Sequence, residues 1–187
     1  MKRILFSLMT IVAVLCVAGA GSFAYFSDTE TSSGNTFTAG TLDLKVDDAD
    51  DPLPVKFTLG PLAPGDSGTI SYELKNAGNI DGYIDLENVI VTNDGGEFTE
   101  PEKAVDPGNL GNLGAAIQVT VTVGGTNVYT GSLDGFAGNH DYSILLTAGT
   151  TTNAVINWEL PGATGNEVQG DIAGLSITFE LQQRAED

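Results

Sequence analysis

The chain has 187 residues, with 25 acidic side chains against seven lysine or arginine side chains, and its formal net charge is −18 at pH 7. A surface this acidic repels nucleic acid and anionic lipid head groups, which argues against both as partners. Cys16 is the only cysteine. The composition therefore excludes a fold that is held together by internal disulfide bonds.

The N-terminus has the pattern of a secretory signal peptide. Met1-Lys2-Arg3 is a short basic start, residues 4–20 are uncharged and apolar, and Ser22-Phe23-Ala24 puts small residues at the −3 and −1 positions of a cleavage site. Cleavage after Ala24 would make Tyr25 the new N-terminus of a secreted protein, extracellular or on the cell surface, with no stable membrane anchor. A single membrane anchor is the alternative, because about 17 apolar residues are the lower limit for a helix that crosses a bilayer.

The predicted mature chain is even more acidic than the precursor. Loss of residues 1–24 removes two basic residues and leaves five against 25 acidic ones, a formal net charge of −20. High salt or bound divalent cations would each offset the resulting self-repulsion. We divide the chain into a signal peptide at 1–24, an N-terminal segment at 25–38 and a single β-domain at 39–187.

Alternation of apolar and polar residues with a period of two dominates the β-domain, and helical periodicity is nearly absent. The clearest runs are residues 70–74, 117–123, 154–160 and 175–181. One apolar and one polar face imply antiparallel sheets that pack through their apolar faces. We therefore predict an all-β fold, a jelly-roll-like antiparallel β-sandwich of about eight or nine strands.

Four local features refine this prediction. The apolar positions of the first mature strand change from odd to even numbers at Gly40, which predicts a β-bulge there. A short helical turn is expected between residues 100 and 113. Gly124-Gly125 separates two strand-like runs and predicts a tight hairpin, because paired glycines accept the positive φ of a two-residue turn. Trp158 lies on an apolar strand face and is expected in the core.

Acidic residues cluster just after the first predicted strand, as Asp47, Asp48, Asp50 and Asp51. Carboxylate oxygens suit Ca²⁺, and a bound cation would relieve the repulsion within the cluster. A run of like charges is commonly a solvated turn, which is the alternative interpretation. A second, looser calcium candidate comprises Asp94, Glu97, Glu100 and Glu102. No cofactor is required, and Ca²⁺ is the only ion we consider.

Catalytic chemistry is poorly supported by the residues. A zinc peptidase usually combines two histidines on one helix face with a general-base glutamate, whereas His140 is the only histidine. We interpret His140 as a turn residue before a strand at 142–146. A cysteine nucleophile is absent from the predicted mature chain, and no Gly-x-Ser-x-Gly motif is present. We therefore assign no catalytic residue and expect no enzyme activity.

An ordered set of motifs resembles the TasA/camelysin family of exported proteins, whose signal peptides are cleaved by a dedicated signal peptidase of the SipW type. The motifs are residues 22–30 and 37–44, Leu62-Ala63-Pro64-Gly65-Asp66, residues 72–79, Trp158-Glu159-Leu160-Pro161, Gly165-Asn166 and Gln169-Gly170-Asp171. They span nearly the whole predicted mature chain.

The resemblance implies a jelly-roll subunit that polymerises head to tail into extracellular biofilm-matrix or pilus-like fibres, with copies of itself as partners. In this family the N-terminal segment of each subunit completes the sheet of its neighbour, so Tyr25, Phe26 and Phe37 would belong to the donor strand. Residues 25–38 would reach roughly 45 Å when extended. A disordered tail is the alternative for this segment, since its composition is polar and small.

Two other functions are also compatible with the sequence. Some members of the family carry a metallo-endopeptidase label, so a secreted peptidase of camelysin type is one alternative. A monomeric cell-surface binding module is another, because jelly rolls host such modules and fold alone does not give function.

Overall fold

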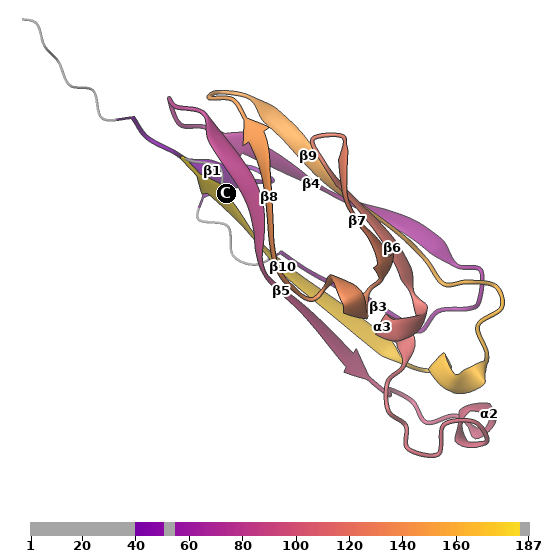
Figure 1. Ribbon diagram of the computed structural model, residues 1–187. Coiled ribbons are helices and arrows are strands. Elements are labelled where there is room, and N and C mark those ends of the chain that lie inside the picture. The colour runs from indigo at the N-terminus through magenta and orange to yellow at the C-terminus, as the bar shows by residue number, and fades with distance from the viewer. Residues whose placement is uncertain (1–39, 51–54, 184–187) are drawn as a thin grey trace, which may run out of the picture. The chain divides into compact units, whose positions relative to one another are not determined.

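A computed structural model describes residues 40–50 and 55–183, and every structural statement below refers to these residues (Figure 1). The predicted cleavage site at Ala24 and Tyr25 lies outside them. So does the predicted donor strand with Phe26 and Phe37. The cleavage site and the donor strand therefore stay predictions.

The described residues form ten strands, two short α-helices and two 3₁₀ turns. In chain order they are β1 (Leu44–Val46), β2 (Ala49–Asp50), β3 (Val55–Leu59), β4 (Ser67–Asn76), β5 (Gly82–Asp94), α2 (Glu100–Lys103), α3 (Leu113–Ala116), β6 (Gln118–Val123), β7 (Thr126–Ser132), η1 (Asp134–Phe136), β8 (Gly138–Leu146), β9 (Thr151–Glu159), η2 (Asn166–Val168) and β10 (Ile172–Gln182).

The strands build two antiparallel sheets. One sheet has the order β2-β1-β4-β9-β6-β7 and the other has the order β3-β10-β5-β8. The eight strands from β3 to β10 therefore form two four-stranded sheets in jelly-roll order, and the short β1–β2 hairpin extends one of them beside β4. The prediction of an all-β sandwich is confirmed.

The two sheets pack through the apolar faces that the alternation indicates. In β6, Val119, Val121 and Val123 are buried while the residues between them are not. In the same sheet, β4 and β9 add the buried side chains of Leu74 and Ile156, and β5 and β10 of the other sheet supply the opposing side chains, which include Ile84, Leu86 and Ile177. Burial of such side chains contributes about 1.5–3 kcal/mol each to folding. Trp158 is half-buried and packs against this core.

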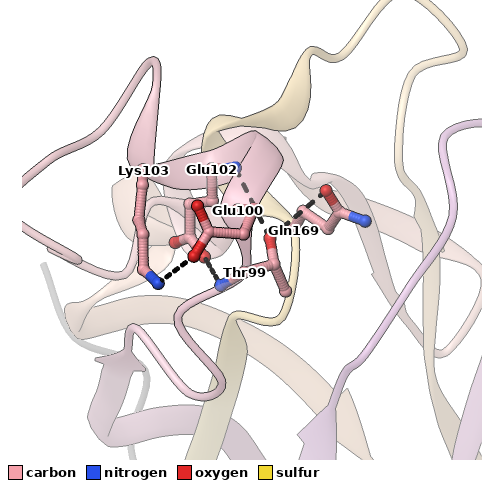
Figure 2. A network of polar contacts seen from close by, with 5 residues as sticks. All are labelled: Thr99, Glu100, Glu102, Lys103 and Gln169. Carbon is pink, nitrogen blue, oxygen red and sulfur yellow. Dashed lines mark hydrogen bonds and ion pairs between the residues drawn. The ribbon is translucent and has the colours of Figure 1, made fainter.

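The predicted hairpin is confirmed. Gly124 and Gly125 separate β6 from β7 and have φ values of 58° and 79°, a conformation that costs a glycine little. A helical turn also occurs in the expected range, as α2, and a second one, α3, follows at Leu113–Ala116 just beyond it. Thr99 caps α2 by accepting a hydrogen bond from the Glu102 N–H, and the Glu102 side chain accepts one from the Thr99 N–H (Figure 2).

The start of the first strand differs from the prediction. β1 begins at Leu44, and Gly40 precedes it without forming a β-bulge. The chain between them is held by a loop instead, because Asn79 N–H donates to the Thr41 carbonyl and Ala77 N–H donates to the Asp43 carbonyl. Tertiary hydrogen bonds to the residue 77–79 loop thus replace the expected strand pairing. Within the described ranges, no helix is long and apolar enough to cross a membrane.

Candidate functional site

One edge of the sandwich is incomplete along β10. On one side, β5 pairs with β10 from Ile172 to Gln182. On the other side, β3 pairs only from Ala173 to Ile177. Among the described residues, the part of β10 from Thr178 to Gln182 therefore has no strand on that side, and we call this part the open edge of β10. Backbone N–H and C=O groups along such an edge can pair with an added strand.

A groove of about 490 Å³ lies beside the open edge, and we call it the β10 groove. Its lining comes from both sheets, with β1 and the residues before it on one side and β10 on the other, and consists of Leu42, Asp43, Leu44, Asp50, Phe179, Glu180 and Leu181. Four of these seven residues are apolar. The groove thus combines four apolar and three acidic lining residues with a strand edge that is open among the described residues.

Packing around the groove is tight at two points. A Cβ atom on Gly82 would lie 2.7 Å from Leu181 and 2.9 Å from Leu42, so only glycine lets both leucines approach β5 here. Below the groove, the Phe179 ring lies 6.1 Å from the Tyr72 ring of the opposite sheet. The residues that line the groove therefore pack against the buried core of the sandwich.

The rim of the β10 groove is acidic. Asp43, Asp50 and Glu180 line it, and Glu180 lies directly opposite the buried Asp85 on β5. Lys45 offsets part of this charge, because its Nζ lies 2.6 Å from Asp50 Oδ1. The hydrogen bond that Lys45 donates to Asp50 is the main reason that the pKa of Lys45 is raised, and the charges of Asp50, Asp43 and Asp48 add to it.

The candidate calcium residues form the turn between β1 and β2. Asp47 and Asp48 have φ values of 51° and 63°, which asparagine and aspartate tolerate better than most residues. Asp47 Oδ1 accepts a 2.8 Å hydrogen bond from the Glu73 N–H, and Asp50 is paired with Lys45. Asp51 lies outside the described residues, so the full cluster stays a prediction.

The second acidic candidate is dispersed over a loop that precedes and includes α2. Asp94 accepts a hydrogen bond from Gly96 N–H, Glu100 pairs with Lys103 at 2.6 Å, and Glu102 belongs to the cap of α2 (Figure 2). Across residues 40–50 and 55–183, no group of three or more His, Cys, Asp or Glu side chains is placed to hold a metal ion.

The loop after α2 and the loop before β10 contain buried carboxylates, Asp106 and Asp171, that the sequence did not reveal. Asp106 accepts hydrogen bonds from the Leu110 N–H at 2.8 Å and from Asn112 Nδ2 at 2.9 Å. The fully buried Asp171 accepts from the Asn112 N–H. These side chains fix the loop against residues 165–171. Only their burial in three dimensions separates them from the many solvated acids of this chain.

His140 lies within β8 and not in a turn before it. Its ring stacks on Tyr142, with centroids 5.4 Å apart, and on Phe136 at 5.0 Å. Its Nε2 atom lies 2.8 Å from the Phe136 carbonyl oxygen. The imidazole is therefore part of an aromatic stack between η1 and β8, and one of its two possible metal-binding nitrogens already has a partner.

Comparison with known proteins gives one match. The family model of camelysin metallo-endopeptidase matches residues 1–121, about two thirds of the chain. This match confirms the resemblance that the sequence motifs indicated. No curated protein matches the chain.

Proposed function

The chain belongs to the camelysin metallo-endopeptidase family, and we propose that it is a secreted structural subunit that polymerises into extracellular fibres. In this proposal a dedicated signal peptidase cuts after Ala24. Residues 25–38 of one copy then occupy the β10 groove of the next copy. The family is generally secreted or associated with the cell surface, which agrees with the signal-peptide pattern of residues 1–24.

The open edge of β10 is the observation that supports the proposal most. It offers backbone partners over residues 178–182, next to the apolar side chains of Leu42, Leu44 and Leu181. An inserted strand would pair with this backbone and place alternate side chains into the groove. Head-to-tail insertion of this kind does not close on itself and therefore builds a filament.

The predicted donor segment is suited in length and position. It precedes Gly40, the first described residue, and would span roughly 45 Å when extended. Tyr25, Phe26 and Phe37 are its aromatic residues and are the candidates to fill the apolar groove. Pairing with a second copy also orders a polar segment that cannot bury a core by itself.

A peptidase is the second candidate, because the family carries that description. The residues do not fit a zinc centre of the usual kind, which needs two or three histidine or cysteine ligands or the His-Glu-x-x-His arrangement. The chain has one histidine, and its Nε2 lies against a backbone carbonyl. Casein cleavage by the purified protein that stops with a chelator would favour this second function.

Electron microscopy of the secreted protein, with and without Ca²⁺, tests the proposal directly. We expect filaments from the normal chain and none from a variant that lacks residues 25–35. The variant should keep the circular dichroism spectrum of the folded monomer and should bind a synthetic peptide of residues 25–38. Filaments from the shortened variant would contradict strand donation. N-terminal sequencing should give Tyr25, and an intact Met1 would contradict cleavage.

A further inference from the structure

The hairpin of β6 and β7 carries no charge in a chain whose net charge is −18. From Pro107 to Leu133 the sequence contains no Asp, Glu, Lys, Arg or His. A second uncharged stretch runs from Tyr142 to Trp158 and includes nearly all of β9. Because β9, β6 and β7 are consecutive in the six-stranded sheet, they form one almost neutral region at the end of that sheet.

The outer face of this region is made of hydroxyl and amide side chains. Thr69, Asn157, Thr120 and Thr130 lie in one cross-strand row over β4, β9, β6 and β7. Thr69 Oγ1 donates a 2.7 Å hydrogen bond to Asn157 Oδ1. The outer face of β9, β6 and β7 is therefore polar, and Glu159 at the end of β9 is its one charged residue.

β7 ends the six-stranded sheet, and Figure 1 shows it beside β6. Within the described ranges, its other side has no strand partner. The strand runs from Thr126 to Ser132 and contains neither a charged residue nor a proline. One register shift interrupts it close to the hairpin, and residues 129–132 pair regularly with β6. The regular part is thus free to pair on its open side.

Three other edge strands are protected against pairing, whereas β4 is open from Ser67 to Tyr72, because among the described residues β1 pairs only with Leu74–Asn76 on that side. β2 has two residues. β3 has five and exposes Lys56, its second residue. β8 exposes Asp141, has Ser143 at a φ of 49°, and shifts register twice against β5. Short length, charge and bulges are the ways in which proteins block edge-to-edge association.

We propose that β7 is a second interaction edge, at which two copies of the chain pair through their β7 strands. The pairing is antiparallel about a two-fold axis, since one strand can pair with itself in that way and satisfy both open edges. The charge distribution favours a second copy. Two acidic molecules repel least where neither carries charge at the contact. This contact uses a different sheet from the open edge of β10 and does not depend on strand donation.

Lysine at the exposed position 130 tests the proposal. A two-fold contact would bring two added charges together, and like charges across paired strands are unfavourable. Thr130→Lys and Thr126→Lys should both abolish the dimer that the unchanged protein forms. Thr58→Lys is the matched control, because Thr58 is also an exposed threonine on an edge strand, beside Lys56 on β3.

Sedimentation velocity is the measurement, after fibres have been removed by centrifugation, at about 0.15 M and about 1 M salt, where the Debye length is about 8 Å and 3 Å. We expect a monomer–dimer equilibrium for the unchanged chain and for Thr58→Lys, and monomers for the two β7 variants. Thermal melting checks that each variant is folded. A monomeric unchanged chain at both salt concentrations, equal dimerisation of all four proteins, or loss of the dimer in Thr58→Lys would each overturn the proposal.

Discussion

Val55 of β3 lies opposite Ile177 of β10, and among the described residues this is the last pair on that side of β10. The next residues of β10 continue as a regular strand beside β5 and reach Gln182 opposite Tyr83. A strand that is paired on one side and open on the other is stable enough to keep its shape and can still accept a partner. Among the described residues, this pair marks where β10 loses its partner on the β3 side.

Leu181→Asp should stop fibre growth without unfolding the subunit. Leu181 is partly buried and lines the β10 groove, so aspartate there places a charge where the donor strand needs an apolar contact. Leu145→Asp is the control, because Leu145 is 55% exposed on the β8 edge. Fibre formation is measured by electron microscopy and by light scattering. Normal fibres from Leu181→Asp would exclude the β10 groove as the acceptor.

The strands that alternate most clearly were the easiest to predict from sequence. In β6 and β10 one face of the strand is buried and the other is at least partly exposed to solvent. The alternation of apolar and polar residues over 118–123 and 172–179 therefore follows the burial of the side chains. The positive φ values of Asp47 and Asp48 could not be predicted from the sequence in this way, because an acidic turn and an acidic cluster of metal ligands have the same amino-acid composition. The open edge of β10 also left no local pattern, since among the described residues it depends on where β3 begins, in a distant part of the chain.

Higher salt should accelerate fibre growth. The predicted donor segment carries Asp28 and Glu30, and the rim of the β10 groove carries Asp43, Asp50 and Glu180, so donor and acceptor repel each other at low ionic strength. Screening shortens the range of this repulsion. The elongation rate, measured by light scattering, should rise with salt and should depend less on salt in the variant Asp28→Asn/Glu30→Gln.

Glu97→Gln provides the control for that experiment, because Glu97 is exposed in the loop before α2, away from the groove residues. It changes the net charge without changing the charge of the donor segment. An elongation rate that falls with salt, or equal salt dependence in all variants, would contradict repulsion between donor and groove.

Stability should fall at alkaline pH, partly through tyrosine. Burial raises the pKa of Tyr72, with a further contribution from Asp47, and burial also raises the pKa of Tyr142. The unfolded chain loses these protons at about pH 10, before the folded chain does, so the folded state binds more protons and becomes less stable as the pH rises through that region. Lys45 has a raised pKa and acts in the same direction.

Tyr72→Phe isolates one of these contributions. Between about pH 9 and pH 11 its melting temperature should decline less steeply with pH than that of the unchanged chain. Near neutral pH the melting temperatures of the two proteins should change with pH at the same rate. Calorimetry at fixed ionic strength measures both curves. Parallel curves over the alkaline range would show that Tyr72 titrates equally in the folded and unfolded states.

Calcium should stabilise the protein no more than other salts of equal ionic strength. Asp47 already accepts a hydrogen bond from the Glu73 N–H, and Asp50 already forms an ion pair with Lys45. Ca²⁺ would have to displace both interactions. A melting shift at millimolar CaCl₂, compared with NaCl, provides the test. A calcium-specific rise that disappears in Asp50→Asn would establish the turn between β1 and β2 as a calcium site.

Asn112 should be the most sensitive polar residue of the loop beside α2. Its Nδ2 donates to Asp106 Oδ2 at 2.9 Å and to the Glu167 carbonyl at 3.3 Å, so it joins the loop to residues 165–171. Asn112→Ala leaves the nearly buried Asp106 with one donor fewer, which we expect to cost about 1–3 kcal/mol. Asn127→Ala removes an exposed contact with Thr130 and should change stability by less than about 0.5 kcal/mol. Urea unfolding gives both values, and equal losses would mean that the carboxylates of this loop are solvated.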